Sequence, residues 1–475
     1  MLIGLLSTPL VHADLLPDLS LRASGNNPTQ GPNLGGIVTW QTSPYKNAGA
    51  IADFIPNYGY DSELLYLDAA RVGLQFKAAG PEIFNTQSAQ RFQLFLAHQF
   101  EGSPLVGATP PVLATLSPRH SGTDAGAAWL LSGPQDQTTL ALQARHDVSQ
   151  TSYGSTIQLS LQHNSPVGPA VLTPELALSW RSASLNRYYY GISAQEATTA
   201  LPAYNPGAGL NVSLGLRAQT WLSEHWQVMG GVAATAFSSG LADSPIVQKH
   251  GVASLYLGLD YEFEPVGASQ HHALTNDNAW FSVLKPDSLK VLTGASTANG
   301  CSLVGIVSMQ CLNLDHKTFT SMVGFQWGQR LIKDWNNWPV DLFADLGLDL
   351  HLEHGQQPDA AQIEVLVKIF YHHFPWDRYV HTRLGLGIGP SDASRPLFAE
   401  SSANHPDAPR SHLMNYMEPT IDFSLGDLLR VDDWRQTYLG FGVSHRSGIF
   451  SSSRLLGNVN GGSNFVVVYL ERVLN

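Results

Sequence analysis

The chain has 475 residues, 13% of them charged and 43% hydrophobic, and a net charge of −12. This length exceeds that of one ordinary domain, so two domains are expected. The negative charge argues against nucleic-acid partners, which need a basic face to neutralise phosphates. After the first residues no apolar run approaches the ~18 residues of a membrane-spanning helix. Spanning helices are therefore excluded, and 43 Gly, 19 Phe, 16 Tyr and 11 Trp in an alternating pattern indicate a β protein.

The first thirteen residues form a short apolar run that ends in the letters VHA. This small-x-small ending suits cleavage by signal peptidase after Ala13, so residues 1–13 are predicted to be a signal peptide. The alternative is a short buried strand. Export also fits the two cysteines, Cys301 and Cys311. A lone close pair in an oxidising compartment is expected to form a disulfide, because a metal would need more ligands.

The segment "LNVSLGLRA", residues 210–218, predicts a β-strand with one apolar face. Leu210, Val212, Leu214 and Leu216 alternate with Asn211, Ser213 and Arg217, which is the period of two that a strand requires. Aromatic residues gather at segment ends, as in "RYYYG" (187–191), "DWNNWP" (334–339) and "YHHFPWDRY" (371–379). A barrel carries its interfacial girdles at such positions. We therefore favour a barrel in the bacterial outer membrane.

The segment "SLYLGLDYEF", residues 254–263, marks the end of a first barrel. It places Tyr256, Gly258, Tyr261 and Phe263 in an order that resembles the terminal strand by which the barrel assembly machinery recognises outer-membrane proteins. Such a strand normally closes a barrel at the C-terminus, but here a long segment follows. We therefore expect two consecutive antiparallel barrels in an all-β protein: residues 14–265 with roughly ten to twelve strands, and residues 266–475 with about eight.

Several motifs of the first unit carry a family resemblance. They are "SPYKNAG" (43–49), "DFIPNYGY" (53–60), "NRYYYGISAQEA" (186–197), "LPAYNPGAGL" (201–210), "LADSPIV" (241–247) and the closing "LGLDYEF". In order and spacing they resemble the MipA/OmpV outer-membrane proteins. The resemblance implies a barrel, an outer-membrane address and a scaffolding role towards peptidoglycan-remodelling enzymes. It does not imply catalysis. From the residues alone, "YNPGAG" and "ADSPIV" are interpreted as turns fixed by Pro and Gly.

The second unit is predicted to contain eight strands of the length that a membrane strand needs. We place them near 288–296, 318–331, 340–353, 361–374, 378–389, 412–425, 437–447 and 463–474. The polar stretch at 391–412, between the fifth and sixth strands, is predicted to be a long extracellular loop.

The third of these strands, "PVDLFADLGLDLHLEH", leaves two folds open. Its even positions are apolar from Val340 to Leu352, and its odd positions include Asp341, Asp345 and Asp349. In a soluble sandwich the leucines would face the core and the acids would face water. In an outer-membrane barrel the leucines would face lipid and the acids the lumen. Recurrence of the pattern, as in "QIEVLVKIFYHH" (362–373), favours the barrel.

The seventh strand, "TYLGFGVSHRS", carries a histidine and a serine on its apolar, lipid-facing side. His445 and Ser447 follow Leu439, Phe441 and Val443 on that face. Because the last strand should end in the periplasm, this pair is expected at the outer leaflet, where lipopolysaccharide resides. The pair is either a catalytic dyad or a polar rim, the latter with Arg446 and Asn464 near sugar phosphates.

The arrangement resembles the PagL-type lipid A deacylases, eight-stranded barrels with a His-x-Ser pair. The resemblance implies that Ser447 attacks an ester carbonyl, His445 takes its proton and a carboxylate orients the imidazole. The chain departs from the family where the orienting glutamate belongs, because Asn458, Val459 and Asn460 stand there. Glu471, on the final strand, is the remaining candidate, although it is expected near the periplasmic end.

Histidines near strand ends offer a further possibility. His351, Glu353 and His354, and the pair His372 and His373, could be proposed as metal ligands. Neighbouring residues on a strand point to opposite faces and no third ligand is evident, so we interpret them as interface histidines, with no metal or cofactor.

Two functional classes remain. The first is a non-enzymatic outer-membrane barrel that scaffolds envelope partners, and the second is a lipid A ester hydrolase built on the second barrel. Both would contact outer-membrane lipid and lipopolysaccharide.

Overall fold

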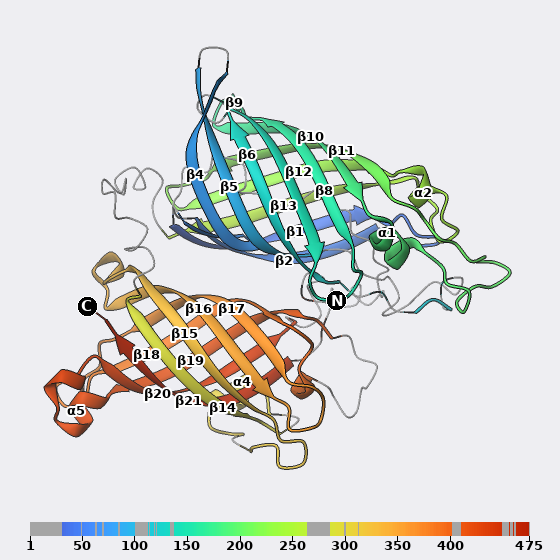
Figure 1. The fold of residues 1–475 in the computed structure, drawn as a ribbon. Helices are drawn as coiled ribbons and strands as arrows, with labels where there is room; N and C mark the ends of the chain where they lie inside the picture. The colour runs from blue at the N-terminus through green and yellow to red at the C-terminus, as the bar shows by residue number, and fades with distance from the viewer. Residues whose placement is uncertain are drawn as a thin grey trace, which may run out of the picture. The chain divides into compact units, whose positions relative to one another are not determined.

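The computed structural model describes residues 31–263 and 286–474, apart from short segments. The segments outside the description are 49, 62–63, 69–70, 84–85, 100–112, 114, 118, 120, 134–136, 299–300, 312, 401–409, 449–455, 457–458 and 460–461. The predicted signal peptide, residues 1–13, lies outside the described residues. The chain divides into two compact units, Met1–Ala273 and Leu274–Asn475, and Figure 1 shows a barrel of tilted strands in each.

The first unit is a closed antiparallel barrel of twelve strands. These are β1 (Gly31–Thr42), β2 (Ala50–Asp61), β3 (Leu65–Asp68), β4 (Arg71–Ile83), β5 (Thr86–His98), β6 (Thr123–Ser132), β7 (Thr138–Asp147), β8 (Ser155–His163), β10 (Ala170–Arg181), β11 (Gly209–Trp221), β12 (Trp226–Ala236) and β13 (Gly251–Glu262). Each pairs with the next, and β13 pairs with β1, Tyr261 opposite Leu34. The short β9 (Ser165–Val167) extends the line of β8 beside β10.

The second unit is a closed barrel of eight strands. These are β14 (Ser288–Ser296), β15 (Ser321–Ile332), β16 (Val340–Leu352), β17 (Ala360–Tyr371), β18 (Thr382–Ala393), β19 (Leu413–Ser424), β20 (Thr437–Ser447) and β21 (Gly462–Val473). Pairing of β14 with β21 closes the ring, Ser288 opposite Val473. The predicted fold class, two consecutive antiparallel barrels with even strand numbers, is confirmed.

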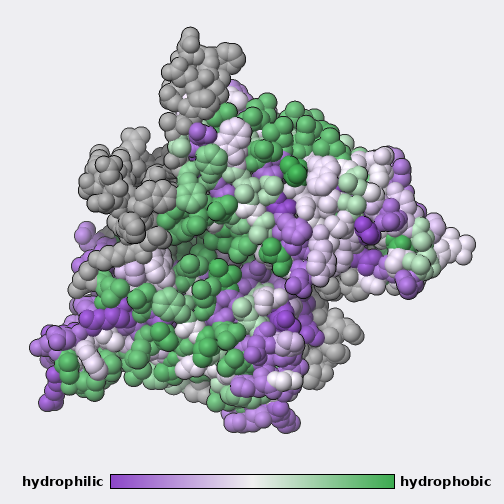
Figure 2. Space-filling view, viewed as in Figure 1, coloured by the Kyte–Doolittle hydropathy of each residue, from purple (hydrophilic) through white to green (hydrophobic). Residues whose placement is uncertain are grey.

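The faces of these strands identify membrane barrels. On β16, Leu348 and Leu350 are 57% and 44% exposed on the outside, while Asp345 and Asp349 are buried in the lumen. On β11 the same outward row holds Leu210, and Leu214 is 61% exposed. Figure 2 shows hydrophobic side chains gathered over the strands of both units. A soluble sandwich would bury its leucines and expose its acids, so that alternative is wrong and the strands face lipid.

In each barrel the longer connections lie at one end, which we name the long-loop end. In the first unit they are 99–122, 182–208 and 237–250, and in the second 297–320, 394–412 and 448–461. Outer-membrane barrels place their longer loops outside the cell, so the long-loop ends are expected to be extracellular. The predicted loop at 391–412 begins later than expected, because Ser391 and Asp392 still pair with β17 and β19.

The helices are short and lie in the connections. They are α1 (Ala183–Tyr190), α2 (Ser239–Ala242), α4 (Leu303–Val307) and α5 (Leu425–Leu429), with 3-10 turns η4 (Trp335–Asn337), η5 (Phe398–Glu400) and η6 (Asp432–Trp434). Over the part of the chain that the structure describes, no helix combines the length and apolar character that crossing a membrane requires.

Candidate functional site

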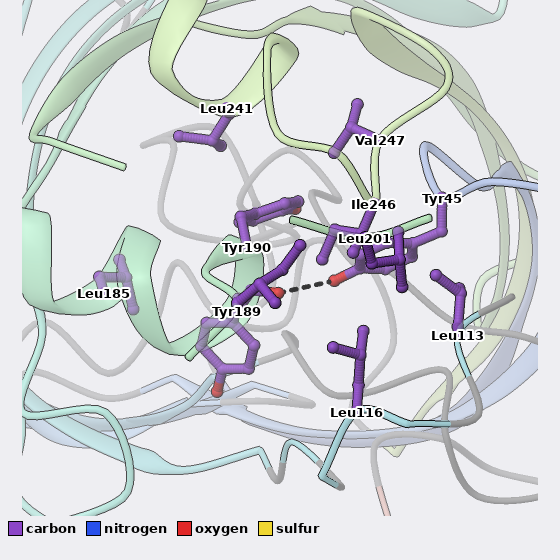
Figure 3. Packing of buried hydrophobic residues seen from close by; sticks show 11 residues of the cluster. Tyr45, Leu113, Leu116, Leu185, Tyr189, Tyr190, Leu201, Leu241, Ile246 and Val247 are labelled. Atoms are coloured by element: carbon purple, nitrogen blue, oxygen red, sulfur yellow. Dashed lines mark hydrogen bonds between the residues drawn. The ribbon is translucent and has the colours of Figure 1, made fainter. Parts of the chain in front are cut away.

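The loops at the long-loop end of the first barrel fold into an apolar cap. Its buried core joins four connections that are distant in sequence: Tyr45, Leu113, Leu116, Leu185, Tyr189, Tyr190, Ile192, Leu201, Leu241, Ile246 and Val247. Figure 3 shows these side chains converging, with the Tyr45 hydroxyl donating to the Tyr189 carbonyl at 3.4 Å. The Ser244 hydroxyl donates to the Tyr190 carbonyl at 2.7 Å. The cap is therefore a packed structure with its own core.

Helix α1 is the element around which the cap is built. It begins at Ser182, whose hydroxyl accepts from the Leu185 N–H at 3.3 Å, as a serine N-cap should. Asn186 is fully buried and joins barrel to loop. Its side-chain oxygen accepts from Arg181 Nε at 2.9 Å, and its amide donates to the Gly207 carbonyl at 2.8 Å.

The "RYYYG" segment therefore differs from its prediction as an interfacial girdle. Tyr189 and Tyr190 are each 1% exposed and lie in the core of the cap, since the segment is helical and a helix turns these rings inward. The motif "LADSPIV" likewise supplies buried Leu241, Ile246 and Val247 and does more than turn the chain. In the other two segments Trp338 is 69% and Tyr379 is 66% exposed, and there the girdle stays a prediction.

A buried ion pair fixes the outer side of the cap. Arg119 contacts both carboxylate oxygens of Glu196, at 2.9 and 3.0 Å. The backbone N–H groups of Ser117 and Ser193 donate to the same carboxylate at 2.9 and 3.0 Å. Burial raises the pKa of Glu196, but the hydrogen bonds from Arg119 and these N–H groups outweigh it and hold the pKa well below its ordinary value. Glu196 is therefore ionised at neutral pH, and it ties two loops together.

Beside this ion pair the cap is hollowed by a pocket of about 900 Å³. Arg119 and Glu196 form part of its wall, and Tyr153, Tyr188 and Tyr204 contribute aromatic side chains. The lining residues come from the loops at 115–119, 148–154 and 182–208. Sequence reasoning missed this site, because its members come from three loops and only the fold brings them together.

The predicted pair on β20 lies on the outer face of the second barrel. His445 and Ser447 are both partly exposed there, in line with Phe441. His445 Nδ1 lies 2.7 Å from Asn464 Oδ1 on the neighbouring β21, directly opposite it in the register. Among the described residues the histidine is bonded to Asn464 and has no hydrogen bond with Ser447.

Asn464 is the residue that sequence reasoning passed over as a partner of His445. Its amide donates to the Cys301 carbonyl at 3.0 Å, which turns its oxygen towards the imidazole. An accepting oxygen at Nδ1 holds the proton on that nitrogen and leaves Nε2 as a base. The strand register could have revealed this partner, because the antiparallel pairing of β20 with β21 sets Asn464 opposite His445.

The disulfide loop reaches this same outer surface. Cys301 and Cys311 are bonded, with Cα atoms 5.5 Å apart. Both pack with Ile306 of α4 against Val443 and Val466 on the outside of β20 and β21. Val443, expected to face lipid, is only 4% exposed for this reason.

Glu471 does not approach His445, so its expected role as the orienting acid is wrong in this structure. It lies on the lumen face of β21 and its carboxylate accepts from Arg383 at 2.8 Å. The barrel wall separates odd from even positions of that strand. Arg446 also faces the lumen, 0% exposed and paired with Glu400 at 2.5 Å, so it is not part of the outer rim.

The lumen of the second barrel is filled by charged side chains. Glu418 accepts from both Lys290 and Lys368, at 2.5 and 2.6 Å, and all three are at most 2% exposed. Gln326 donates to the other Glu418 oxygen at 2.8 Å. A second pairing joins Arg383 to Asp422. An eight-stranded barrel is just wide enough to be filled by its own side chains, and here Lys290, Lys368 and Arg383 are each paired with a carboxylate.

The histidines considered as ligands separate in space. His351 is in the lumen, 3.1 Å from Gln362 Oε1, and His354 is 2.8 Å from the Ser321 hydroxyl. His372 lies within 3.4 Å of Asp334 and Asp341 at the short-loop end. The Asp341 carboxylate, 3.3 Å from Nε2, raises the pKa of His372 despite burial, and Arg330 lies 3.9 Å from the same aspartate. The ligand atoms of Asp334, Asp341 and His372 lie within 4.8 Å of one another, so the structure supplies the further ligands that the sequence did not reveal, and the same contacts form a network of ion pairs.

Comparison with known proteins matches most of the first unit to one family model. Residues 34–263 match the family model described as MltA-interacting protein MipA. The outer membrane protein OmpV of Vibrio cholerae is 29% identical over 109 residues, which cover 23% of this chain and 42% of that protein. The MltA-interacting protein of Escherichia coli K12 is 31% identical over 128 residues, 27% of this chain and 50% of that protein. These matches span half or less of the two relatives.

A longer match and a structural likeness complete the comparison. The putative outer membrane protein YiaT of Escherichia coli K12 is 23% identical over 235 residues, covering 49% of this chain and 90% of that protein. The crystal structure of the outer membrane enzyme PagL aligns with 39% of this chain and 99% of its own, at 13% identity and a TM-score of 0.24. A likeness this low says nothing about the activity of the second barrel.

Proposed function

Because the first unit of this chain belongs to the MipA/OmpV family of outer-membrane proteins, we propose that the protein is a closed structural barrel that holds peptidoglycan-remodelling enzymes at the outer membrane. The observation that carries the proposal is the cap. A twelve-stranded ring leaves an interior wider than an eight-stranded one, and four connections pack over its mouth. A barrel closed in this way is suited to holding partners at its ends rather than passing solutes.

The partner class comes from the relative named as MltA-interacting protein. The surface available to a periplasmic enzyme would be the short-loop end of the first barrel, which includes the turn at 222–225. Glu224 is exposed in this turn. The outer-membrane lipid and its lipopolysaccharide would surround the apolar rows of both barrels.

The test is direct binding between purified proteins. The full chain in detergent is immobilised and titrated with the MltA-type lytic transglycosylase of the same bacterium. We expect saturable binding in the micromolar range or tighter, about −8 kcal/mol or better, and weaker binding to the Glu224→Lys protein. A planar-bilayer recording should show no porin-like steps. Stable open steps together with no enzyme binding would contradict the proposal.

A second candidate function is ester hydrolysis at the outer face of the second barrel. The observation that favours it is the bond of 2.7 Å between His445 Nδ1 and Asn464 Oδ1. With the proton on Nδ1, Nε2 would take the Ser447 proton as its oxygen attacks an acyl ester carbonyl of a lipid. The tetrahedral intermediate would expel the alcohol, which receives that proton, and water would then release the acyl chain. A neutral Asn stabilises the imidazolium less than a carboxylate would.

Lipid A from cells with and without the gene tests this candidate by mass spectrometry. The expected result is loss of one hydroxyacyl chain, abolished by Ser447→Ala with barrel assembly unchanged, because a rim serine adds little to folding. Asn464→Asp should raise acyl release. If the Ser447→Ala protein deacylates as well as the original, the pair is a polar rim.

A further inference from the structure

We propose that the pocket in the cap of the first barrel is a binding site for a saccharide that carries an acidic group. The pocket holds about 900 Å³, within the range of small-molecule sites. It is concave and lies wholly within one unit. A protein partner would instead need a broad interface, of roughly 800 Å² on each side.

Tyr153 is an aromatic side chain presented on the pocket wall. It is 62% exposed, and its backbone is left-handed, with φ of 52°. This region is unfavourable for a residue with a side chain, so the surroundings must hold it. The Asp147 carboxylate accepts from the Tyr153 N–H at 2.8 Å, and the Ser184 hydroxyl donates to the Tyr153 carbonyl at 2.9 Å. The backbone of Tyr153 is thus held by hydrogen bonds on both sides, and its ring is exposed at the pocket.

Two further tyrosines make the wall aromatic and polar together. Tyr204 donates its hydroxyl to the Gly240 carbonyl at 2.9 Å, and the Arg119 guanidinium lies 5.8 Å from the centre of the Tyr188 ring. Aromatic rings with a polar tip combine an apolar face and a hydrogen-bonding group. The apolar C–H face of a sugar ring packs on such rings while its hydroxyls bond to neighbouring polar groups, and Ser152, Ser184 and Ser193 supply hydroxyls to the lining.

The charge of the pocket selects an acidic sugar. Among the described residues that line it, the charged ones are Arg119, Arg187 and Glu196. Arg119 and Glu196 neutralise each other at 2.9 Å. Arg187 is exposed in the last turn of α1 and leaves a net positive charge in the lining. A guanidinium binds a carboxylate or phosphate with two parallel hydrogen bonds.

The test uses the full chain in detergent and three probes in calorimetric titrations. The acidic probes are trigalacturonate and the core oligosaccharide released from the lipopolysaccharide of the same bacterium, which distinguish a free acidic saccharide from a lipid-derived one. Maltotriose is the neutral probe. We expect saturable binding of at least one acidic probe, at least about tenfold tighter than that of maltotriose.

Two variants connect binding to the pocket. Arg187→Glu should lower the affinity for the acidic probe at least about tenfold and leave the affinity for maltotriose unchanged. Tyr153→Gly suits the left-handed backbone and should weaken both kinds of probe, by about fivefold to tenfold. Arg378→Glu and Tyr379→Ala, an exposed pair in the second unit, are the matched controls and should change nothing.

Circular dichroism and heat modifiability establish that each variant is folded. Absence of saturable binding of every probe overturns the proposal, as does binding that neither pocket variant weakens. Equal loss of acidic and neutral probes in Arg187→Glu overturns the assignment of an acidic ligand. None of these results depends on whether the protein binds a peptidoglycan enzyme.

Discussion

The two barrels present the same kind of surface to lipid and are closed in different ways, although the walls of both turn polar side chains inward. In the first, apolar loop residues such as Leu201 and Leu241, both fully buried, pack over the mouth. In the second, Lys290, Lys368 and Glu418 cross the lumen as a charged cluster. The difference follows ring size. A ring of eight strands can be filled by side chains from its own wall, whereas a wider ring needs material from its loops.

The comparison also separates two kinds of stability. An apolar cap built from loops can open while the hydrogen-bonded wall stays intact, because local opening requires only the loss of its own contacts. A charged cluster belongs to the wall strands themselves, so loss of one member leaves partner charges buried.

The largest effect is expected from Glu418→Ala. The substitution leaves the ammonium groups of Lys290 and Lys368 buried without their carboxylate, a loss of about 3–5 kcal/mol in the free energy of unfolding. Urea unfolding of the full chain, followed by heat modifiability, should show the second barrel weakened and the first unchanged.

A compensated variant controls this experiment. Replacing all three side chains together, as Lys290→Met, Lys368→Met and Glu418→Leu, removes every charge of the cluster and should restore most of the stability. If Glu418→Ala alone leaves unfolding unchanged, the charged cluster does not hold the second barrel together.

The next effect is expected from Leu241→Ala in the cap. The leucine is 0% exposed, and truncation of such a side chain costs about 2–5 kcal/mol. The loss should appear as faster proteolysis within 191–208, with the β-structure of both barrels retained. Leu222→Ala, at a position 64% exposed in a turn, is the control. Co-unfolding of cap and wall would show that the cap is not a separate unit.

In the second barrel a disulfide, and not a large apolar core, holds one of the loops at the long-loop end. Closing the loop between Cys301 and Cys311 is expected to add about 2–3 kcal/mol. The double change Cys301→Ser and Cys311→Ser should lower the stability of the loop around α4 by this amount. A free-thiol assay on the unfolded, unreduced protein should find no thiols, and a count of two thiols would contradict the bond.

The smallest effect concerns acid. Because the pKa of Glu196 is held below its ordinary value of 4.5, the ionised group stabilises the cap above that pH. This contribution is lost as the pH falls from 4.5 towards the lowered value of the folded state. The free energy of opening the cap should therefore fall by about 1.5 kcal/mol in acid, and the cap should be cleaved faster by protease. Glu196→Gln should be less resistant near neutral pH and lack this decline, whereas an identical acid profile would refute the role of the carboxylate.

The strands of the second barrel were predictable to within about three residues at each bound, except for β18 (Thr382–Ala393), which begins and ends four residues later than the predicted 378–389. The strands predicted at 288–296 and 437–447 match β14 and β20 at both bounds, because a lipid-facing row must be apolar at every second position. The closing strand at 254–263 was recognisable for the same reason, and β13 indeed pairs with β1. The cap was not predictable, since a helical segment of eight residues, α1, carries aromatic residues that also suit a girdle.

The candidate sites were predictable only in part. Alternation placed His445 and Ser447 on the outer face, but the partner of His445 depended on strand register and proved to be Asn464. Glu471 was assigned to the correct face of its own strand, and that face is turned away from the histidine. The pocket residues Arg119 and Tyr153 carry no local signal, because polar loops contain many such residues.

The sequence alone was enough to predict two consecutive barrels, the strands of the second barrel to within a few residues and which side chains share a face, because these depend on a local period of two. For the first barrel it left a range of ten to twelve strands, and the closed ring of the structure has twelve. Tertiary structure decided which face meets lipid in "PVDLFADLGLDLHLEH", since the same alternation serves a soluble sandwich. It also decided how Tyr45, Leu113, Tyr190 and Leu241 meet in one core. Residues so far apart in the chain come together only when the closed ring brings its loops to one mouth.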